Sequence, residues 1–354
     1  MPSKKILTAY NVAAYVWPSY TGQEPRTRIF WPKGIGEWET VEARIRQKPL
    51  WGMRDEADPA VMEHQIAEAV KHGVNTFIYD WYWYDNRPFL ENCLNDGFLG
   101  APNNKKMKFF LMWANHNVNH LWDVRNSSRD MRTVIWDAAL NFAQFQEIGR
   151  RWIEKYFCLE NYYKIDGKPV LSIFDTGNLL RGLGGEDGAA RAFDWLRNEL
   201  IKEGFAGLHL QLIKFGGEGI FPLVKALQAD SVTHYQTACY TPAGRDFADW
   251  LPAMRQEFDL IDKHGVPYFP HVSVGWGSQP RFLKPQNDDM TNCTPENIKK
   301  ALQLAKDYID THDIPPLVTL NSWNEWTETS YLQPDDVNGY GYLEAVRDVF
   351  GGAG

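Results

Sequence analysis

The amino-acid sequence predicts a (β/α)8 barrel, also called a TIM barrel, that forms a single domain over residues 1–354. Three observations lead to it: eight apolar runs rich in Val, Ile and aromatic residues, helical patterns between most of them, and no Gly-x-Gly-x-x-Gly motif after the first run. The runs are continuous rather than alternating, which is typical of parallel strands covered on both faces. A doubly wound open sheet is the alternative, but that fold usually carries the glycine motif.

The expected strands follow one another at intervals that mostly leave room for a helix. They cover residues 7–17, 74–83, 108–114, 169–174, 208–215, 230–235, 268–275 and 317–323. Gly, Pro, Asn or Asp bounds each run, and these residues commonly end strands. Eight strands with intervening helices are the repeat of a (β/α)8 barrel.

Helical patterns fill the intervals, and the clearest one begins at Pro59. Asp58 is the expected N-cap, Pro59 stands at the first helical position, and Gly73 is a good stop. Thr294 is a second expected cap. The other expected helices cover residues 137–157, 188–203, 222–228, 247–264, 295–311 and 340–350. The glycine-rich segment 182–188 reads as a surface loop before a helix.

Composition narrows the class of protein. The chain has 37 Lys and Arg against 45 Asp and Glu, a formal net charge of −8, and no Lys/Arg run longer than a pair. This balance argues against nucleic acid or an anionic membrane surface as a partner. No apolar stretch approaches the roughly 20 residues of a membrane span, and no signal peptide is recognised. We expect a cytoplasmic protein, or a periplasmic or secreted one if a leader has been removed. The oligomeric state stays open.

Neither cofactor nor metal is expected. Cys93, Cys158, Cys239 and Cys293 stand more than 50 residues apart, so we expect reduced structural thiols rather than a Cys-x-x-Cys site. The sequence has neither a His-Glu-x-x-His motif nor a Gly-x-Ser-x-Gly nucleophile elbow. The alternative is a metal-dependent hydrolase in which strand-end histidines converge on an ion. Those histidines are His116, His234 and His271.

Polar and aromatic residues gather where the expected strands end, which is where barrels of this kind place their chemistry. The chain also has 15 Trp, more than its core needs. Flat rings pack against the C–H faces of sugars, and carboxyl, amide and imidazole groups hydrogen-bond to the hydroxyls. The residues expected to bind substrate are Tyr15, Trp17, Asp80, Trp81, Trp83, Trp113, Asn115, His116, Tyr235, His271, Trp276, Arg281 and Asn324. The alternative for any single ring is that it fills the barrel interior.

Glu325 and Glu328, after the last strand, are the expected catalytic pair. Glycosidic cleavage usually needs two carboxyl groups, one to protonate the leaving oxygen and one to attack or stabilise the anomeric centre. A spacing of three places both on one face if the chain turns there, and proximity pushes their pKa values apart. In a continuing strand they would point to opposite faces, so the prediction requires that the strand has ended by Trp323 or Asn324.

Several segments together resemble a known family. Asn324-Glu325-Trp326 with Glu328 resembles the Trp-Asn-Glu-Trp-x-Glu signature of glycoside hydrolase family 99 and the related WbsX-like proteins of polysaccharide loci. Further matching blocks, in the same order, are Glu63-His64-Gln65-Ile66, Asp80-Trp81-Tyr82-Trp83, Trp113-Ala114-Asn115, Gly275-Trp276 and Tyr331-Leu332-Gln333-Pro334-Asp335. The resemblance spans nearly the whole chain.

The resemblance implies a metal-independent retaining glycoside hydrolase that cleaves an α-mannoside-like or related linkage in an oligosaccharide or polysaccharide. It implies that Glu325 deprotonates the sugar 2-hydroxyl, which attacks the anomeric carbon, and that Glu328 is the general acid/base. The residues alone suggest an ordinary nucleophile and acid/base pair. The other class of function is a non-catalytic carbohydrate-binding or polysaccharide-assembly protein.

Four positions depart from the family pattern, and one of them is Val118, where the pattern often has Trp. Thr329 stands where the family commonly has Gly after the second glutamate, His116 where it often has Glu, and Gln333 replaces an acidic residue. These changes leave the paired glutamates in place but leave the sugar open.

Overall fold

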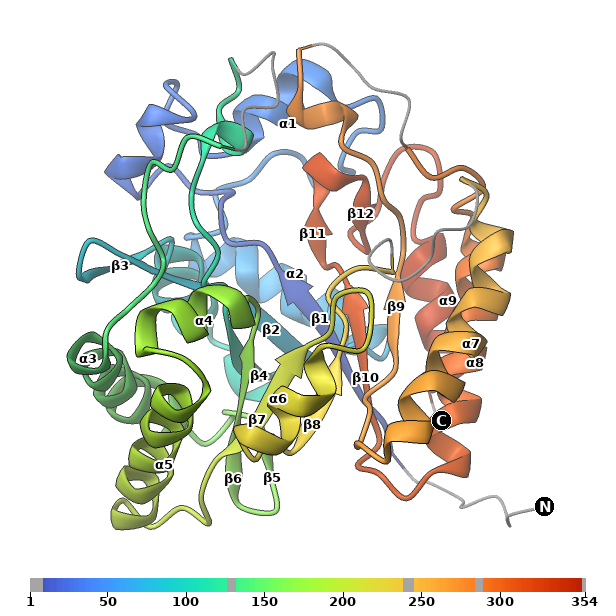
Figure 1. The fold of residues 1–354 in the computed structure, drawn as a ribbon. Coiled ribbons are helices and arrows are strands. Elements are labelled where there is room, and N and C mark those ends of the chain that lie inside the picture. Colours follow the sequence, from blue (N-terminus) through green and yellow to red (C-terminus); the bar gives the residue numbers. More distant parts are fainter. Residues whose placement is uncertain (1–8, 126–131, 238–244, 284–288, 352–354) are drawn as a thin grey trace.

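The computed structural model describes residues 9–125, 132–237, 245–283 and 289–351. Its centre is a parallel barrel with helices around it (Figure 1). The barrel strands are β1 (Asn11–Val16), β2 (Thr76–Tyr84), β4 (Lys108–Trp113), β6 (Lys168–Ile173), β7 (His209–Ile213), β8 (Ser231–Thr233), β9 (His271–Ser273) and β10 (Leu317–Asn321). Each falls within, or within a residue of, one of the eight predicted runs. The predicted (β/α)8 architecture is therefore confirmed.

The strands lie side by side in the order β8-β7-β6-β4-β2-β1-β10-β9. An isolated parallel bridge between Val232 and Tyr268 joins the two ends of this order. There the Phe269 N–H donates to the Val232 carbonyl at 3.0 Å. The short strands β3 (Arg87–Phe89) and β5 (Lys164–Ile165) extend β2 and β6 as antiparallel hairpins.

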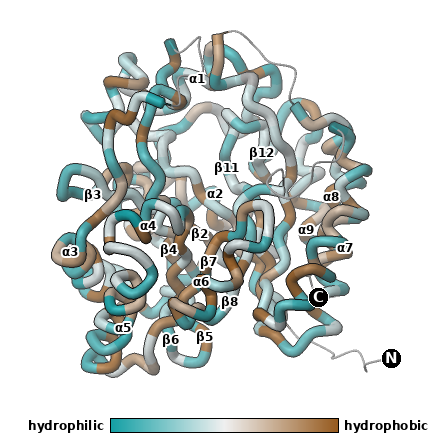
Figure 2. Tube along the Cα trace, viewed as in Figure 1, coloured by the Kyte–Doolittle hydropathy of each residue, from teal (hydrophilic) through white to brown (hydrophobic). Residues whose placement is uncertain are grey.

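Helices cover the outside of the barrel, and their apolar faces meet the apolar strands (Figure 2). They are α1 (Trp38–Arg44), α2 (Pro59–Lys71), α3 (Phe142–Trp152), α4 (Thr176–Leu183), α5 (Glu186–Lys202), α6 (Ile220–Ala226), α7 (Phe247–His264), α8 (Pro295–Thr311) and α9 (Gly341–Phe350). The seven predicted helices all appear, whereas α1 and α4 were not predicted. The expected helix over 137–157 begins only at Phe142 and ends in a π-helical turn, Ile153–Phe157.

Local signals set several helix ends as expected. The Asp58 carboxylate accepts the Ala60 N–H at 2.8 Å, and the Thr294 hydroxyl accepts the Asn297 N–H at 3.3 Å. The glycine-rich segment was predicted wrongly as a loop, because α4 continues to Leu183. Only Gly184 and Gly185 separate α4 from α5, with φ values of +82° and +91°. Glycine tolerates this left-handed region, which allows the abrupt turn.

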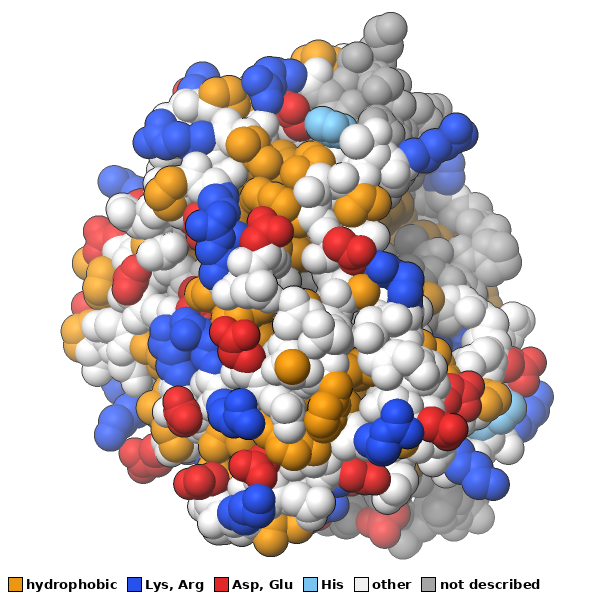
Figure 3. Space-filling model, turned by 60° about the vertical axis from the view of Figure 1, so that its left-hand side comes forward, with side chains coloured by type: hydrophobic (Ala, Val, Ile, Leu, Met, Phe, Trp, Pro, Cys, Tyr) orange, Lys and Arg blue, Asp and Glu red, His pale blue; other side chains and the backbone are white. Residues whose placement is uncertain are grey.

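Charged side chains of both signs are interspersed on the face shown in Figure 3. Within the described ranges, no helix combines the length and apolarity that crossing a bilayer requires. Cys93, Cys158 and Cys293 are free thiols, and the prediction for Cys239 lies outside the described residues.

Candidate active site

A cavity of about 460 Å³ opens where the barrel strands end. Its lining comes from β2 and β4 and from the segments that follow β1, β4, β6, β8, β9 and β10. The lining residues are Trp17, Asp80, Tyr82, Met112, Ala114, His116, Asn117, Val118, Asn119, Leu121, Trp122, Phe174, Asp175, Asn178, Tyr235, Arg281, Glu325 and Glu328. Carboxyl groups and aromatic rings thus line the same cavity.

The two glutamates reach this cavity because the chain turns directly after β10. β11 (Asn324–Glu325) pairs with β12 (Ser330–Tyr331), and the 3-10 turn Trp326–Glu328 connects them. Residues i and i+3 of a 3-10 turn lie on the same face. The expected turn between Glu325 and Glu328 is therefore present, and both side chains line the cavity.

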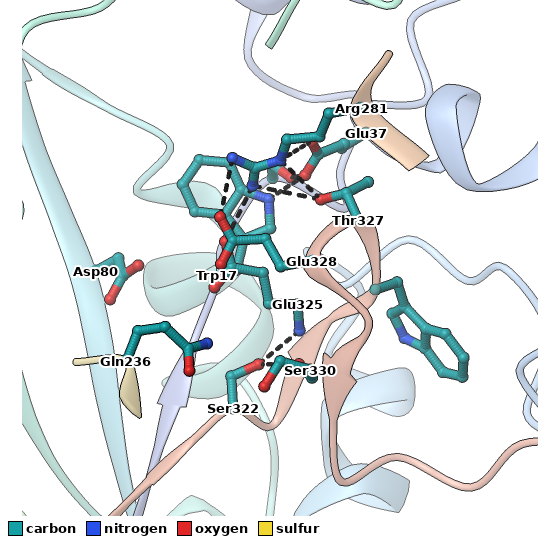
Figure 4. A network of polar contacts seen from close by, with 12 residues as sticks. Trp17, Glu37, Asp80, Gln236, Arg281, Ser322, Glu325, Thr327, Glu328 and Ser330 are labelled. Atoms are coloured by element: carbon teal, nitrogen blue, oxygen red, sulfur yellow. Dashed lines mark hydrogen bonds and ion pairs between the residues drawn. The ribbon is translucent and has the colours of Figure 1, made fainter. Parts of the chain in front are cut away.

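Two serines hold this turn against the end of β10. Ser322 Oγ accepts the Glu325 N–H at 2.7 Å and donates to the Ser330 carbonyl at 2.6 Å. Ser330 Oγ donates in turn to the Asn321 carbonyl at 2.7 Å. Because these groups are all buried, the bonds fix the backbone that carries Glu325 (Figure 4).

Thr329 follows the turn with a φ of +52°, a left-handed conformation that β-branched residues rarely adopt. Its N–H donates to the Trp326 carbonyl at 3.1 Å and closes the turn. The turn thus requires the conformation that glycine accepts most easily, which gives a physical reason for a glycine at this position in the family pattern.

One guanidinium binds both glutamates. Arg281 Nη2 lies 2.9 Å from Glu325 Oε1, and Nη1 lies 3.2 Å from Glu328 Oε1. A third carboxylate, Glu37, approaches Arg281 Nε at 3.8 Å and also accepts the indole N–H of Trp17. Figure 4 shows Arg281 beside the Trp17 ring, with the three carboxylates around it. All of these groups are buried.

Burial and crowding of negative charge raise the pKa of several of these carboxyl groups. Desolvation raises the pKa of Glu328 well above its usual range, and the nearby Glu325 adds to the effect, although Arg281 opposes it. Desolvation likewise raises the pKa of Glu37 and of Asp80. One arginine does not compensate the charge of several buried carboxyl groups, and this imbalance favours the protonated form of the three whose pKa is raised.

Asp80 faces the glutamates from β2, and Tyr235 links the two sides. The Tyr235 hydroxyl lies 3.0 Å from Asp80 Oδ2 and 2.8 Å from Glu325 Oε2. Asp80 Oδ1 and Glu328 Oε2 are buried without a hydrogen-bond partner. Buried polar atoms rarely stay unpaired, so these two oxygens are available to a bound hydroxyl.

Aromatic rings form the rest of the wall. The Trp122 ring lies 5.1 Å from that of Trp17 and 5.8 Å from that of Tyr82, measured between centroids. The Phe174 ring contacts Tyr235 at 5.2 Å, edge to face. These rings provide flat apolar surface next to the carboxyl groups.

His116 supplies a neutral acceptor beside these rings. Its Nδ1 lies 3.1 Å from the Asn117 carbonyl oxygen, which can only accept, so Nδ1 carries the hydrogen. Burial lowers the pKa of His116, which keeps Nε2 unprotonated. The imidazole therefore offers one lone pair for a donor such as a sugar hydroxyl.

The structure brings seven of the fifteen predicted site residues to the cavity. These are Trp17, Asp80, His116, Tyr235, Arg281, Glu325 and Glu328. The other eight, Tyr15, Trp81, Trp83, Trp113, Asn115, His271, Trp276 and Asn324, do not line it.

Strand alternation turns three of the predicted tryptophans outward. Along β2, Asp80 and Tyr82 face the cavity, so Trp81 and Trp83 face the surrounding helices. Trp81 Nε1 donates to Glu91 at 2.8 Å, and the Trp113 ring packs 5.7 Å from that of Trp152 in α3. These rings belong to the interface between barrel and helices.

The other predicted residues that do not line the cavity either hydrogen-bond to the backbone of segments around it or lie elsewhere in the barrel. Tyr15 donates to the His234 carbonyl inside the barrel, and Trp276 stands beyond β9. Asn324 accepts the Trp17 N–H at 2.8 Å and donates to its carbonyl at 2.9 Å, which joins β11 to the segment after β1. Asn115 brackets the backbone of Asp175 with two bonds of 2.7 Å.

The three strand-end histidines do not converge. His271 contacts the hydroxyls of Thr319 and Ser273 inside the barrel, at 2.9 and 3.0 Å. His234 Nε2 instead faces Glu257 of α7 at 3.2 Å. No cluster of three metal-ligating side chains occurs in the described part of the chain.

Sequence reasoning missed Glu37 and Trp122. Neither follows a strand directly: Glu37 precedes α1, and Trp122 lies in a 3-10 turn, His120–Trp122, well beyond β4. The surplus of tryptophan was the available signal for Trp122. No motif or strand end near Glu37 in the sequence indicates a site residue. Glu37 becomes part of the site because α1 packs beside the turn that carries Arg281.

The fold and this cavity define a class of protein. Eight parallel strands, a shell of helices and a carboxylate-lined cavity at the strand ends make the chain a TIM barrel whose cavity lies where proteins of this fold place their active sites. The model of the family described as glycosyltransferase WbsX matches residues 12–346, and the chain belongs to this WbsX family. The resemblance noted in the sequence is thereby confirmed.

Curated relatives come from Xanthomonas campestris pv. campestris and carry the description uncharacterized protein WxcX. One is 25% identical over 343 residues, which cover 92% of this chain and 47% of the relative. The chain thus spans about half the length of the curated relatives it matches.

Solved structures share the fold at low sequence identity. The endo-α-mannosidase of glycoside hydrolase family 99 from Bacteroides thetaiotaomicron superposes with a TM-score of 0.63 at 13% identity, covering 96% of both chains. A protein described as glycoside hydrolase-like gives a TM-score of 0.60 at 16% identity, covering 99% of this chain and 96% of the other.

Proposed function

We propose that the protein is a metal-independent retaining glycoside hydrolase that cleaves an α-mannoside-like or related linkage in a glycan or polysaccharide. The observation that carries the proposal is the binding of Glu325 and Glu328 by the two terminal nitrogens of Arg281 at the wall of the cavity. Retaining hydrolysis needs two carboxyl groups close together, one that keeps a proton and one that stays ionised.

The two glutamates divide these tasks by environment. Glu328 has a raised pKa and an unpartnered oxygen in the cavity, which suits a general acid that protonates the leaving oxygen. Glu325 receives Arg281 on one oxygen and lies by the Tyr235 hydroxyl on the other, which suits an anion. It would deprotonate the 2-hydroxyl, which attacks the anomeric carbon. The intermediate is a 1,2-anhydro sugar. Glu328, now ionised, would then take a proton from water as the water oxygen attacks the anomeric carbon. The bond from that carbon to O2 breaks, and O2 regains its proton from Glu325.

The family is described as a glycosyltransferase, and such enzymes commonly take the sugar from a nucleotide-sugar donor, so we ask whether the cavity suits that donor or a neutral glycan. Arg281 is the cavity's one Lys or Arg among the described lining residues, and carboxylates already occupy it. A nucleotide-sugar diphosphate would therefore find no free Lys or Arg among the described lining residues to pair with its phosphates. The charge of the cavity therefore favours a neutral glycan donor, with water or another sugar hydroxyl as the acceptor.

The test compares Glu328→Gln with the unmodified chain on a panel of mannose-containing and bacterial glycans, with products read by mass spectrometry. We expect glycan binding to persist and turnover to fall by about 10³-fold or more. Glu160→Gln, at an exposed position, is the control and should turn over normally. Undiminished turnover in Glu328→Gln would overturn the assignment. Binding without cleavage by the unmodified chain would favour a non-catalytic carbohydrate-binding protein.

A further inference from the structure

We propose that Asp80 is a neutral carboxylic acid in the resting protein. Its O–H group donates a hydrogen bond to the Tyr235 hydroxyl oxygen, and the Tyr235 hydroxyl therefore donates its own hydrogen to Glu325. Asp80 then acts as a positioning residue that works through Tyr235. The inference deepens the proposed function, and its kinetic consequence depends on that function. The protonation of Asp80 itself does not.

The contacts of the Tyr235 hydroxyl need more hydrogens than a phenol carries. The Tyr235 hydroxyl lies within hydrogen-bond distance of two carboxyl oxygens, Asp80 Oδ2 at 3.0 Å and Glu325 Oε2 at 2.8 Å. A phenol has one hydrogen to donate and lone pairs that accept. If both carboxyl groups were ionised, one of the two contacts would bring oxygen lone pairs together without a hydrogen. A second proton on either Asp80 or Glu325 makes both contacts hydrogen bonds.

The neighbouring cation decides which group holds that proton. Arg281 Nη2 lies 2.9 Å from the other oxygen of Glu325, and this charge favours the ionised form of Glu325. No Lys or Arg forms an ion pair with Asp80 among the described residues, and Asp80 is only 4% exposed. The proton therefore belongs on Asp80, and the Tyr235 hydrogen belongs to Glu325.

The second oxygen of Asp80 leads to the same conclusion independently. Oδ1 is buried and has no hydrogen-bond partner. An unpaired oxygen of an ionised carboxylate carries a large desolvation cost, whereas the carbonyl oxygen of a neutral acid carries a much smaller one. With the proton on Oδ2, Oδ1 is such a carbonyl, and it remains free to accept a hydroxyl of the substrate.

Burial and the nearby carboxyl groups favour the neutral form of Asp80 and outweigh the one neighbour that opposes it. Desolvation raises its pKa well above the usual range, and the charge of Glu325, together with that of Glu328 when it is ionised, raises it further, whereas the hydrogen bond with Tyr235 lowers it. Tyr15 of β1, Tyr82 of β2 and Tyr235 beyond β8 are buried phenols whose pKa values burial raises, so all three stay uncharged. The remaining titratable groups of the cavity are His116, Asp175 and Arg281.

The consequence for catalysis is a directed hydrogen bond. Glu325 receives Arg281 on Oε1 and Tyr235 on Oε2, so its orientation is fixed before substrate binds. Removing the Asp80 proton would let Tyr235 turn its hydrogen toward Asp80. Glu325 would then lose one donor and its fixed orientation as the base.

Infrared difference spectroscopy tests the protonation without any substrate. The protein is labelled with ¹³C at the aspartate side-chain carboxyl, and unmodified and Asp80→Asn chains are compared at pH 7. We expect the unmodified chain to show the carbonyl band of an un-ionised carboxylic acid, Asp80→Asn to lack it, and Tyr235→Phe to shift its frequency. Absence of the band from the unmodified chain, or its persistence in Asp80→Asn, would overturn the proposal.

A pair of variants then tests the coupling to Glu325. Asn can donate an N–H to Tyr235 and present a carbonyl to the cavity, as a neutral Asp does, whereas Leu can do neither. We expect Asp80→Asn to retain at least about tenfold more kcat/KM than Asp80→Leu, and Tyr235→Phe to abolish that difference. Circular dichroism checks that each variant folds. Equal losses in both Asp80 variants, with Tyr235 present, would refute the positioning role. If the unmodified chain cleaves no glycan, the proposed function fails, and the infrared measurement still decides whether Asp80 is protonated.

Discussion

Arg281 Nη1 lies 3.2 Å from Glu328 Oε1, and the same guanidinium binds Glu325 through its other terminal nitrogen. Arg281 belongs to the 3-10 turn Gln279–Arg281 after β9, so its contacts tie that turn to the glutamate turn after β10. The folded state therefore depends on the charge of Arg281, because removing this cation leaves buried carboxylates uncompensated.

Replacing Arg281 is therefore expected to affect folding and catalysis together. Arg281→Met should lower the free energy of unfolding by about 3–5 kcal/mol at neutral pH, since carboxylates are then buried without their cation. Arg281→Lys should recover part of that stability but lose most turnover, because an ammonium cannot bridge both carboxylates in the same way. Urea unfolding and glycan turnover give the two readings. Arg87→Lys, at an exposed position in β3, is the matched control.

The rate of glycan cleavage should fall on the alkaline side of its pH profile. Glu328 must carry a proton to act as the acid, and its raised pKa keeps the proton at pH values where an exposed glutamate has lost it. The rate is therefore retained below the pKa of Glu328 and lost as pH rises through it. The measurement is kcat/KM against pH. A rate that keeps rising toward alkaline pH would contradict the assigned role.

Glu56 provides a separate test through stability. Burial raises its pKa from 4.5 to about 7, although Gln65, Gln333 and Asn324 all donate to its carboxyl group. A raised pKa of an acid contributes stability below about pH 4.5 that is lost as the pH rises to about 7.

The unfolding free energy of the unmodified chain, relative to Glu56→Gln, should thus fall by about 3 kcal/mol between those two pH values. Because Gln does not titrate, the comparison cancels the contribution of every other group. Urea unfolding of both proteins at a series of pH values gives the difference. A difference that does not change with pH would contradict the prediction.

Two tryptophans are expected to differ in what they do. Trp122 lines the cavity, so Trp122→Ala should weaken glycan binding by about 1–2 kcal/mol, or roughly tenfold. Trp113 packs between the barrel and α3, so Trp113→Ala should cost about 3–5 kcal/mol of stability while the folded fraction binds glycan normally. Calorimetric titration and urea unfolding separate the two effects. Weakened binding in folded Trp113→Ala would contradict this division.

Thr329 stores backbone strain that glycine would release. Thr329→Gly should raise the free energy of unfolding by about 1 kcal/mol, because relief of a positive φ outweighs the extra freedom of glycine in the unfolded chain. Thr311→Gly, at the end of α8, is the control and should lower it by a similar amount. A melting temperature for Thr329→Gly below that of the unmodified chain would show that the threonine is not strained.

Local sequence signals determined most of the fold. The eight strands and the caps at Asp58 and Thr294 follow from apolar runs and from residues that act on their immediate neighbours, whereas the turn between Glu325 and Glu328 was only a condition of the predicted catalytic pair. The helix α4 escaped prediction because its short apolar pattern ends in a glycine segment that reads as a loop. Such signals depend on a few consecutive residues, so they can be interpreted without knowing the tertiary structure.

The tertiary structure alone decided which side chains meet. Sequence placed Asp80 and Trp81 together at a strand end, but only the barrel shows that Asp80 faces the cavity and Trp81 faces Glu91. It also brings Glu37, from a distant segment, to Arg281. The raised pKa values arise from the same assembly, because burial and the distance between charges exist only once the strands have closed around the site. The sequence determined the list of reactive groups, and packing determined that Glu325 and Glu328 contact the same cation, Arg281.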